Sequence, residues 1–232
     1  ILSSQHPEHG GLVYFTPMRP GHYRMYSSVQ DSMWCCVGSG IENHSKYGEL
    51  IYSKNDDNLW VNLFIPSTLD WLQQDLKVTQ QSHFPDANNI TLVINTLDKK
   101  HNSSAQLHIR KPSWVTDELQ FKLNGKAINA TAEQGYYAIK HDWHDGDKLT
   151  FSLAPKLYTE QLPDDQDYYA VLYGPVVMAT KVQAFKNEHL NFVADDSRMG
   201  HIAAGPTCPP EALPIMLSEP EQFIADLKRA PS

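Results

Sequence analysis

Residues 59–64 read Leu-Trp-Val-Asn-Leu-Phe, so that Leu59, Val61 and Leu63 alternate with the residues between them. A period of two predicts a strand with one face towards a core. Further short apolar runs follow, bounded by Asn-, Asp-, Gly- or Pro-containing turns, at residues 76–78, 90–94, 106–109, 136–139 and 149–153. Because no long helical pattern separates them, the sequence predicts a mainly β fold, an antiparallel β-sandwich or jelly roll.

The clearest turn lies in residues 119–126, Leu-Gln-Phe-Lys-Leu-Asn-Gly-Lys. Asn124-Gly125 tolerates the positive φ angles of a type I′ turn, so we expect a two-residue hairpin there. The apolar stretch 168–182 is interrupted by Gly174-Pro175. We expect it to form a pair of core strands and not a membrane span, which needs about 20 apolar residues.

Three parts are expected along the chain: residues 1–48, a β-sandwich over 49–182, and a Pro- and Gly-rich extension or start of a further module over 183–232, with a weakly helical stretch near 219–229. The first part suggests a loop region with a short strand at residues 12–15 and a short helix over 40–47. Ser39 and Glu42 match a capping box at the start of that helix, and Gly48 can end it.

The bulk properties fit a globular protein of 232 residues that is 41% hydrophobic and 20% charged. A net charge of −8 argues against nucleic acid as a partner, because phosphate binding needs clustered Lys and Arg. No membrane partner is expected either. The start, Ile-Leu-Ser-Ser, has no Met and no leader pattern, so we expect an internal cut, and it does not indicate a compartment.

The strongest chemical candidates are the adjacent thiols Cys35 and Cys36. They lie a few residues before the predicted helix, whose N-terminal amides and dipole favour negative charge and lower a thiol's pKa. Two adjacent cysteines can also share one Zn²⁺, which leaves two ligands to come from elsewhere. Their spacing alone, however, favours two buried thiols that act as small hydrophobic residues.

Other residues give weaker signals. No established metal-ligand spacing is formed by His6, His9, His22, His44, His141 and His144. Cys208, which lies beside prolines, can supply a third thiolate only if the C-terminal segment folds back. Most tryptophans of a sandwich pack in its core, so only Trp34, beside the thiols, is proposed to stack on a sugar.

Residues 33–49, Met-Trp-Cys-Cys-Val-Gly-Ser-Gly-Ile-Glu-Asn-His-Ser-Lys-Tyr-Gly-Glu, resemble a signature of β-L-arabinofuranosidases of glycoside hydrolase families 127 and 146. Residues 59–67, 169–175 and 196–202 also look like that family, in the same order. The Gly-x-Gly-x-Glu-Asn-His pattern that follows the cysteines looks more like the 146 branch. The resemblance implies an (α/α)6 barrel with the active site, followed by β-sandwich domains, and residues 1–48 would be the end of that barrel.

The resemblance also implies roles. Cys35 would be the nucleophile and a zinc ligand, Cys36 a second zinc ligand, and Trp34, Glu42 and His44 are the candidates for substrate binding. The family's third cysteine, its zinc-binding glutamate and its acid/base glutamate would lie in barrel sequence that this chain does not contain. We therefore expect part of a retaining hydrolase that releases L-arabinofuranose from plant-type oligosaccharides or polysaccharides, in a secreted or periplasmic setting, and no activity from this chain alone.

Two other functions stay open. A noncatalytic β-sandwich, serving as a carbohydrate-binding or structural module of a larger enzyme, would bind glycans through exposed aromatic residues and tolerate Cys35→Ala. A thiol-based redox or metal-storage protein would form a reversible disulfide between Cys35 and Cys36, although a ring closed between adjacent residues is strained.

Overall fold

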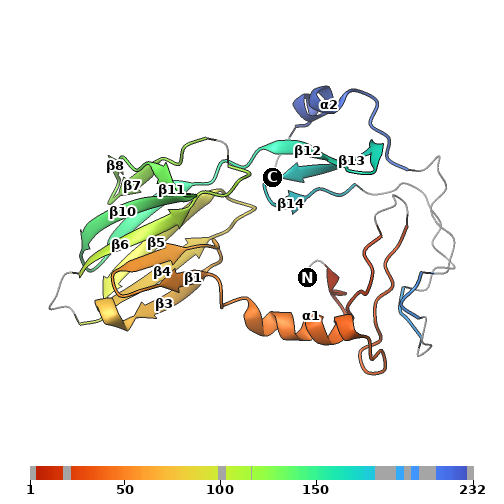
Figure 1. Ribbon diagram of the computed structural model, residues 1–232, viewed down its shortest axis with the longest axis horizontal. Coiled ribbons are helices and arrows are strands. Elements are labelled where there is room, and N and C mark those ends of the chain that lie inside the picture. Colours follow the sequence, from red (N-terminus) through yellow and green to blue (C-terminus); the bar gives the residue numbers. More distant parts are fainter. Residues whose placement is uncertain are drawn as a thin grey trace. The chain divides into compact units, whose positions relative to one another are not determined.

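The computed structural model describes residues 4–17, 22–98, 103–115, 117–180, 192–195, 200–203 and 213–228. The chain forms two compact units, one made of residues 1–47 with 179–232 and the other of residues 48–178. Figure 1 shows that the second unit contains all the strands, β1 to β14, of the described residues. Neither helix in the described part of the chain is long and apolar enough to cross a membrane.

The second unit is built around a β-sandwich (Figure 1). One sheet has the order β1-β2-β6-β10-β9, with bounds Tyr52–Lys54, Asn58–Val61, Ser103–Arg110, Tyr136–Trp143 and Ala132–Glu133. The other has the order β3-β4-β5-β11-β7-β8, with bounds Ser67–Trp71, Leu76–Ser82, Asn89–Thr96, Asp147–Ser152, Phe121–Leu123 and Lys126–Ile128. Neighbouring strands pair antiparallel except β2 and β6, which run parallel with Leu59 opposite Leu107. The expected mainly antiparallel β fold is confirmed.

Alternating burial gives the sandwich its core. In β6, Ala105, Leu107 and Ile109 are fully buried, whereas the residues between them are partly exposed. The largest fully buried side chains include Trp71, Trp143, Tyr137 and Phe121. Because a fully buried Leu or Ile contributes roughly 1.5–3 kcal/mol, this double layer is the main source of stability in the second unit.

The hairpin between β7 and β8 forms as predicted. Asn124 and Gly125 connect the two strands with φ angles of 50° and 80°. Both angles lie in the left-handed region that a type I′ turn requires, and Leu123 pairs with Lys126 across it. The local sequence signal therefore determines this connection.

A small third sheet follows the sandwich, with β12 (Leu157–Leu162), β13 (Asp165–Tyr173) and β14 (Val176–Val177) in that order. β13 and β14 form the strand pair expected around Gly174-Pro175. The pair does not lie in the core, because Val177 is 64% exposed and only Leu172 of its apolar residues is buried. The apolar run predicted the two strands correctly but not their burial, because most side chains of β13 and β14 are partly or fully exposed. Residues 181 and 182 of the expected pair lie outside the described residues.

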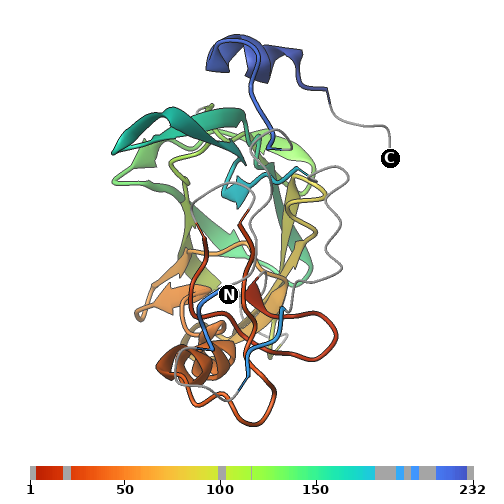
Figure 2. The same ribbon diagram turned by 90° about the vertical axis from the view of Figure 1, so that its right-hand side faces the viewer.

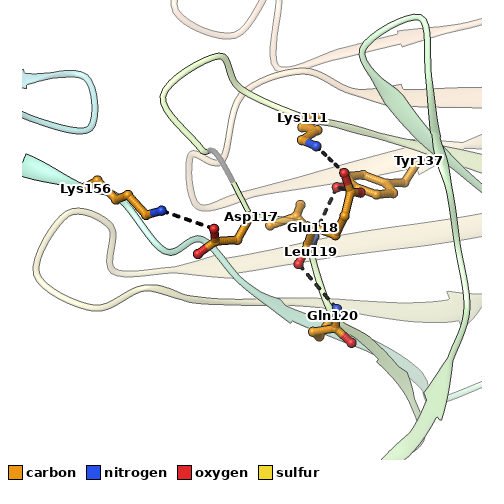
Figure 3. Close-up of polar contacts among 7 residues, drawn as sticks. All are labelled: Lys111, Asp117, Glu118, Leu119, Gln120, Tyr137 and Lys156. Atoms are coloured by element: carbon orange, nitrogen blue, oxygen red, sulfur yellow. Dashed lines mark hydrogen bonds and ion pairs between the residues drawn. The ribbon is translucent and has the colours of Figure 1, made fainter. Parts of the chain in front are cut away.

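Polar contacts hold the loop between β6 and β7 (Figure 3). The Glu118 carboxylate accepts hydrogen bonds from Lys111 Nζ and, at 2.6 Å, from the Tyr137 hydroxyl. The hydrogen bond from Lys111, followed by that from Tyr137, holds the pKa of Glu118 below its usual value. Asp117 accepts a bond from Lys156 at 3.1 Å, which links this loop to the residue just before β12.

The first unit is irregular and contains α1 (Cys35–Lys46) and, within the expected 219–229 stretch, α2 (Pro220–Asp226). The expected strand at residues 12–15 is absent. In its place, isolated bridges join Gln5 to Leu12, Val13 to Tyr26 and Tyr26 to Val193. Figure 2 shows the N-terminal segment (red) beside the segment around Val193 (blue).

The predicted start of α1 at Gly40 is wrong, because the helix begins five residues earlier, at Cys35. Extended Trp34 is its N-cap, with no side-chain hydrogen bond, and Ser39 lies within the helix. Gly40 is buried against Leu12, so close that a Cβ at position 40 would approach Leu12 Cδ1 to 2.5 Å. The capping box therefore does not form, and Ser39 lies within the helix next to the glycine that packs on Leu12.

Candidate active site

The two thiols lie at the N-terminal end of α1 as its first two residues. Their sulfur atoms are 3.8 Å apart, Cys35 is exposed and Cys36 is half-buried. The interpretation as two buried hydrophobic thiols is therefore wrong. Because the first amides of a helix have no carbonyl acceptor within it, the N–H groups at this end favour a negative charge more directly than the sequence predicted.

The electrostatics of the pair depend on how close the two sulfurs are. Burial, and then the hydrogen bond and negative charge of Cys35, raise the pKa of the Cys36 thiol. The charge of Cys35, the hydrogen bond that it accepts and, to a lesser extent, the charge of Cys36 raise the pKa of Tyr14. Two thiolates in this position therefore repel each other, and a cation between them would relieve that repulsion.

The donor set fits zinc. Two thiolates bound to one tetrahedral Zn²⁺ at about 2.3 Å lie about 3.8 Å apart, which is the distance between Sγ of Cys35 and Sγ of Cys36. In the described part of the chain, no third ligand atom from His, Cys, Asp or Glu is grouped with these two sulfurs. Cys208 lies outside the described residues.

Aromatic rings surround the thiols. The ring of Tyr14, which contacts Cys35, lies 6.3 Å from that of Trp34 and 4.6 Å from that of His201. The Trp34 and His201 rings are 5.6 Å apart. Nδ1 of His201 is buried and has no hydrogen-bond partner among the described residues. These rings form an aromatic wall, which we define as Tyr14, Trp34 and His201, beside a half-exposed sulfur pair.

Sequence reasoning found Trp34 but missed Tyr14 and His201. His201 lies in residues 196–202, which resemble the family, but the resemblance implies no role for His201. Tyr14 lies in the segment predicted as a strand, and only the tertiary structure places it beside Cys35.

The other two predicted site residues lie further along α1. At about 1.5 Å per residue, exposed Glu42 is about 10 Å along the axis from Cys35 and on the same side, whereas His44 is on the opposite side. His44 uses Nδ1 towards the Gly40 carbonyl, at 2.8 Å, and Nε2 towards Gln5 Oε1, at 3.2 Å. The structure therefore groups Trp34, Cys35 and Cys36, but does not bring Glu42 or His44 to them.

Comparison with known families gives matches in three parts of the chain. Residues 1–49 match the model of the β-L-arabinofuranosidase GH127 catalytic domain, and residues 58–155 match that of the GH127 middle domain. Two models of the GH127 family thus match separate parts of the chain. Residues 158–232 match a domain of unknown function. The GH127 catalytic model thus covers both thiols, and the middle-domain model covers every strand of the sandwich except β1.

Solved structures agree with this fold. A GH127 β-L-arabinofuranosidase from Geobacillus stearothermophilus T6 superposes with a TM-score of 0.62 at 17% identity, over 76% of this chain and 30% of that one. A second GH127 β-arabinofuranosidase gives 0.61 at 20% identity, over 76% and 30%. A protein described as a glycoside hydrolase gives 0.58 at 18% identity, over 71% and 27%. The chain therefore spans about 30% of the length of these GH127 enzymes. No curated protein sequence matches it.

Proposed function

We propose that this chain is the C-terminal part of a retaining GH127 glycoside hydrolase that releases L-arabinofuranose, with Cys35 as its nucleophile. The observation that supports this best is the thiol pair itself: two adjacent sulfurs, 3.8 Å apart, on the first turn of a helix within the part matched by the catalytic model. The rest of the barrel, with the acid/base carboxylate, would be the partner of this chain. Residues 1–48, 49–182 and 183–232 would be the barrel end, the sandwich and the extension.

Cys35 is the better nucleophile of the two thiols because its sulfur is exposed, whereas Cys36 is half-buried. Its thiolate would attack the anomeric carbon and displace the aglycone oxygen, which takes a proton from an acid outside this chain. Water would then attack the same carbon, give its proton to that base, and release the sulfur as thiolate. Two inversions at one carbon retain the configuration.

Cys35 and Cys36 would both hold a zinc ion, which, when bound, keeps the sulfur deprotonated and stabilises it as it leaves. The fit of the sulfur separation to tetrahedral zinc supports this assignment. The N-terminal end of α1 adds to it, since the helix amides favour the same negative charge.

The aromatic wall gives the substrate one face on which to pack. Trp34 is proposed to stack on the sugar ring next to the thiols, as aromatic side chains do with apolar sugar faces. Glu42 is proposed to contact the glycan further from the reacting carbon, which agrees with its position along α1 on the same side as Cys35. His44 lies on the opposite side with both ring nitrogens bonded, so its position gives no support to the same role.

The test uses the longer polypeptide that contains this chain and an aryl β-L-arabinofuranoside. Cys35→Ser should lower kcat by about 10³-fold or more, because a neutral hydroxyl replaces the thiolate. Cys36→Ser should lower both bound zinc and activity. Cys208→Ser tests the third cysteine, and it should change neither, because the resemblance implies that the family's third zinc-binding cysteine lies in the missing barrel sequence. A pentose adduct on the peptide with Cys35, trapped from a slow substrate, would identify the nucleophile directly, and full activity of Cys35→Ser would refute it.

One observation favours a second candidate function, glycan binding by the sandwich. A surface hollow of about 320 Å³ is lined by Leu50, Ser53, Trp60, Asn62, Leu63, Arg110 and Tyr136. The Tyr136 hydroxyl donates to Asn62 Oδ1 at 2.9 Å, and Nε of Arg110 is buried without a partner among the described residues. An indole beside orienting polar groups is the composition of a small-ligand site. Trp60→Ala should abolish binding of arabinan oligosaccharides to the 232-residue chain, whereas Cys35→Ala should not, and unchanged binding by Trp60→Ala would exclude this hollow.

A further inference from the structure

Far from the thiols in sequence, one connection between the two sheets of the sandwich gathers two histidines and a carboxylate. β10 ends at Trp143 in one sheet and β11 begins at Asp147 in the other. His141 lies near the end of β10 and His144 in the turn. The spacing of the histidines alone does not predict this group, because the third member is the carboxylate of Asp147.

The Asp147 carboxylate is held in place. Its side chain is 10% exposed. Oδ1 accepts a hydrogen bond from Asn124 Nδ2 at 2.7 Å, and Oδ2 accepts one from the His144 backbone N–H at 2.8 Å. The Asp147 N–H in turn donates to the His144 carbonyl at 3.1 Å, which closes the turn. A ligand oxygen that is already oriented needs little reorganisation to bind a cation.

The neighbouring strand end is also rigid. Trp143 is fully buried and donates its indole N–H to the Ala105 carbonyl at 2.9 Å. Its ring packs edge-on against His141, with ring centroids 5.0 Å apart. Gly146, in the turn itself, donates its N–H to the Ile94 carbonyl at 2.9 Å. Both ends of the connection are therefore fixed to different strands.

The ligand atoms are spaced for one small ion. His141 Nε2 lies 3.3 Å and His144 Nδ1 3.8 Å from Asp147 Oδ2, and all three atoms lie within 4.8 Å of one another. A tetrahedral Zn²⁺ with bonds of about 2.0–2.1 Å separates its ligand atoms by about 3.3 Å. Exposed His144 would need to move about 0.5 Å closer to Asp147, and also closer to His141 where their nitrogens are more than about 3.3 Å apart.

We infer that His141, His144 and Asp147 form a second metal site, for a borderline divalent transition metal such as zinc, within the sandwich. Two imidazoles and one carboxylate are a ligand set that zinc accepts, and a fourth position stays open for water. Because the ligands come from the connection between the sheets, the ion would stabilise that connection. This inference does not depend on the proposed glycosidase function.

The experiment uses the 232-residue chain with both thiols removed, Cys35→Ser with Cys36→Ser, so that the sulfur pair cannot contribute. Equilibrium dialysis against zinc, followed by metal analysis, should give one zinc per chain. Cobalt(II) should give the visible absorption of a four-coordinate ion without an ultraviolet thiolate band. Zinc should also raise the melting temperature, since a ligand that binds only the folded state stabilises it.

Substitutions of the two histidines test which side chains bind the zinc. In this background, His141→Gln and His144→Gln should each weaken zinc binding by about 10-fold or more and remove the zinc-dependent rise in melting temperature. His83→Gln, which changes an exposed histidine elsewhere in the unit, is the matched control and should do neither. Circular dichroism of the metal-free variants checks that they fold. Absence of zinc from the double-serine variant, or zinc binding that survives both histidine variants, would overturn the inference.

Discussion

Leu12 packs against Gly40 so closely that the structure leaves no room for a Cβ at position 40 of α1. A Cβ at position 40 would lie 2.5 Å from Leu12 Cδ1, whereas a Cβ at Gly38, one half-turn away, would meet nothing within 4 Å. Packing therefore requires a glycine at position 40, whereas no contact in the structure requires one at position 38.

Gly40→Ala should destabilise the docking of α1, by about 1–3 kcal/mol, because the added methyl overpacks the contact with Leu12. Gly38→Ala should instead stabilise the helix by about 0.5–1 kcal/mol, because Ala loses less backbone entropy than Gly. Hydrogen exchange of the peptide that contains α1 measures this local stability. Equal effects of the two substitutions would show that Leu12 does not constrain the helix.

Leu107→Ala should lower the free energy of unfolding of the second unit by about 2–5 kcal/mol, because Leu107 is fully buried in β6 between two paired strands. Leu72→Ala provides the control at a 74% exposed leucine and should change it by about 0.5 kcal/mol or less. Urea denaturation followed by far-ultraviolet circular dichroism measures both. A loss below 1 kcal/mol for Leu107→Ala would contradict this core.

Stability should depend on pH through Glu118. Lys111 and Tyr137 hold its pKa below the usual 4.5, so the unfolded chain binds its proton first as pH falls. The stabilisation is therefore fully present at neutral pH and is lost as pH falls below about 4.5 towards the folded pKa. Glu118→Gln should lower the urea midpoint at pH 7 but much less at pH 3.

Asp117→Asn is the control for that experiment, since Asp117 and Lys156 form an exposed ion pair beside the same loop. Such a pair contributes about 0–1 kcal/mol, so its removal should shift the midpoint little at either pH. If Glu118→Gln were equally destabilising at pH 7 and pH 3, its carboxylate charge would not be the cause.

The 232-residue chain alone should release no L-arabinose, because no acid/base carboxylate has been assigned to it and the thiols supply only two zinc ligands. We also expect its thiol pair to bind zinc weakly, measured with His141→Gln so that only the sulfurs contribute. Zinc-dependent L-arabinose release by this chain, or nanomolar zinc affinity lost on Cys36→Ser, would contradict the expectation.

Local patterns predicted the sandwich well. Alternation at Leu59 and Val61 identified β2, and Asn124-Gly125 identified the hairpin, because both signals depend on residues adjacent in sequence. The parallel pairing of β2 with β6 was not predictable in this way, since the two strands are separated by three others.

The candidate site was only partly accessible from the sequence. The motif around Cys35 identified the thiols, but Ser39 and Glu42 suggested a helix start that is wrong, because both residues lie inside a helix that begins at Cys35. The proposed metal ligands of the sandwich, His141, His144 and Asp147, are also not predictable from sequence spacing. His141 and His144 have no ligand spacing on their own, and a tight turn is needed to bring Asp147 to them.

The aromatic wall beside the thiols has a consequence for surveys of genomes. Tyr14 and His201 come from opposite ends of the chain, and their rings are 4.6 Å apart. A homologue that kept the Cys-Cys motif but lost the segment around His201 would still be counted as an intact enzyme by a motif search, although its sulfur pair would have different surroundings. Specificity in such families should therefore be compared over both segments together.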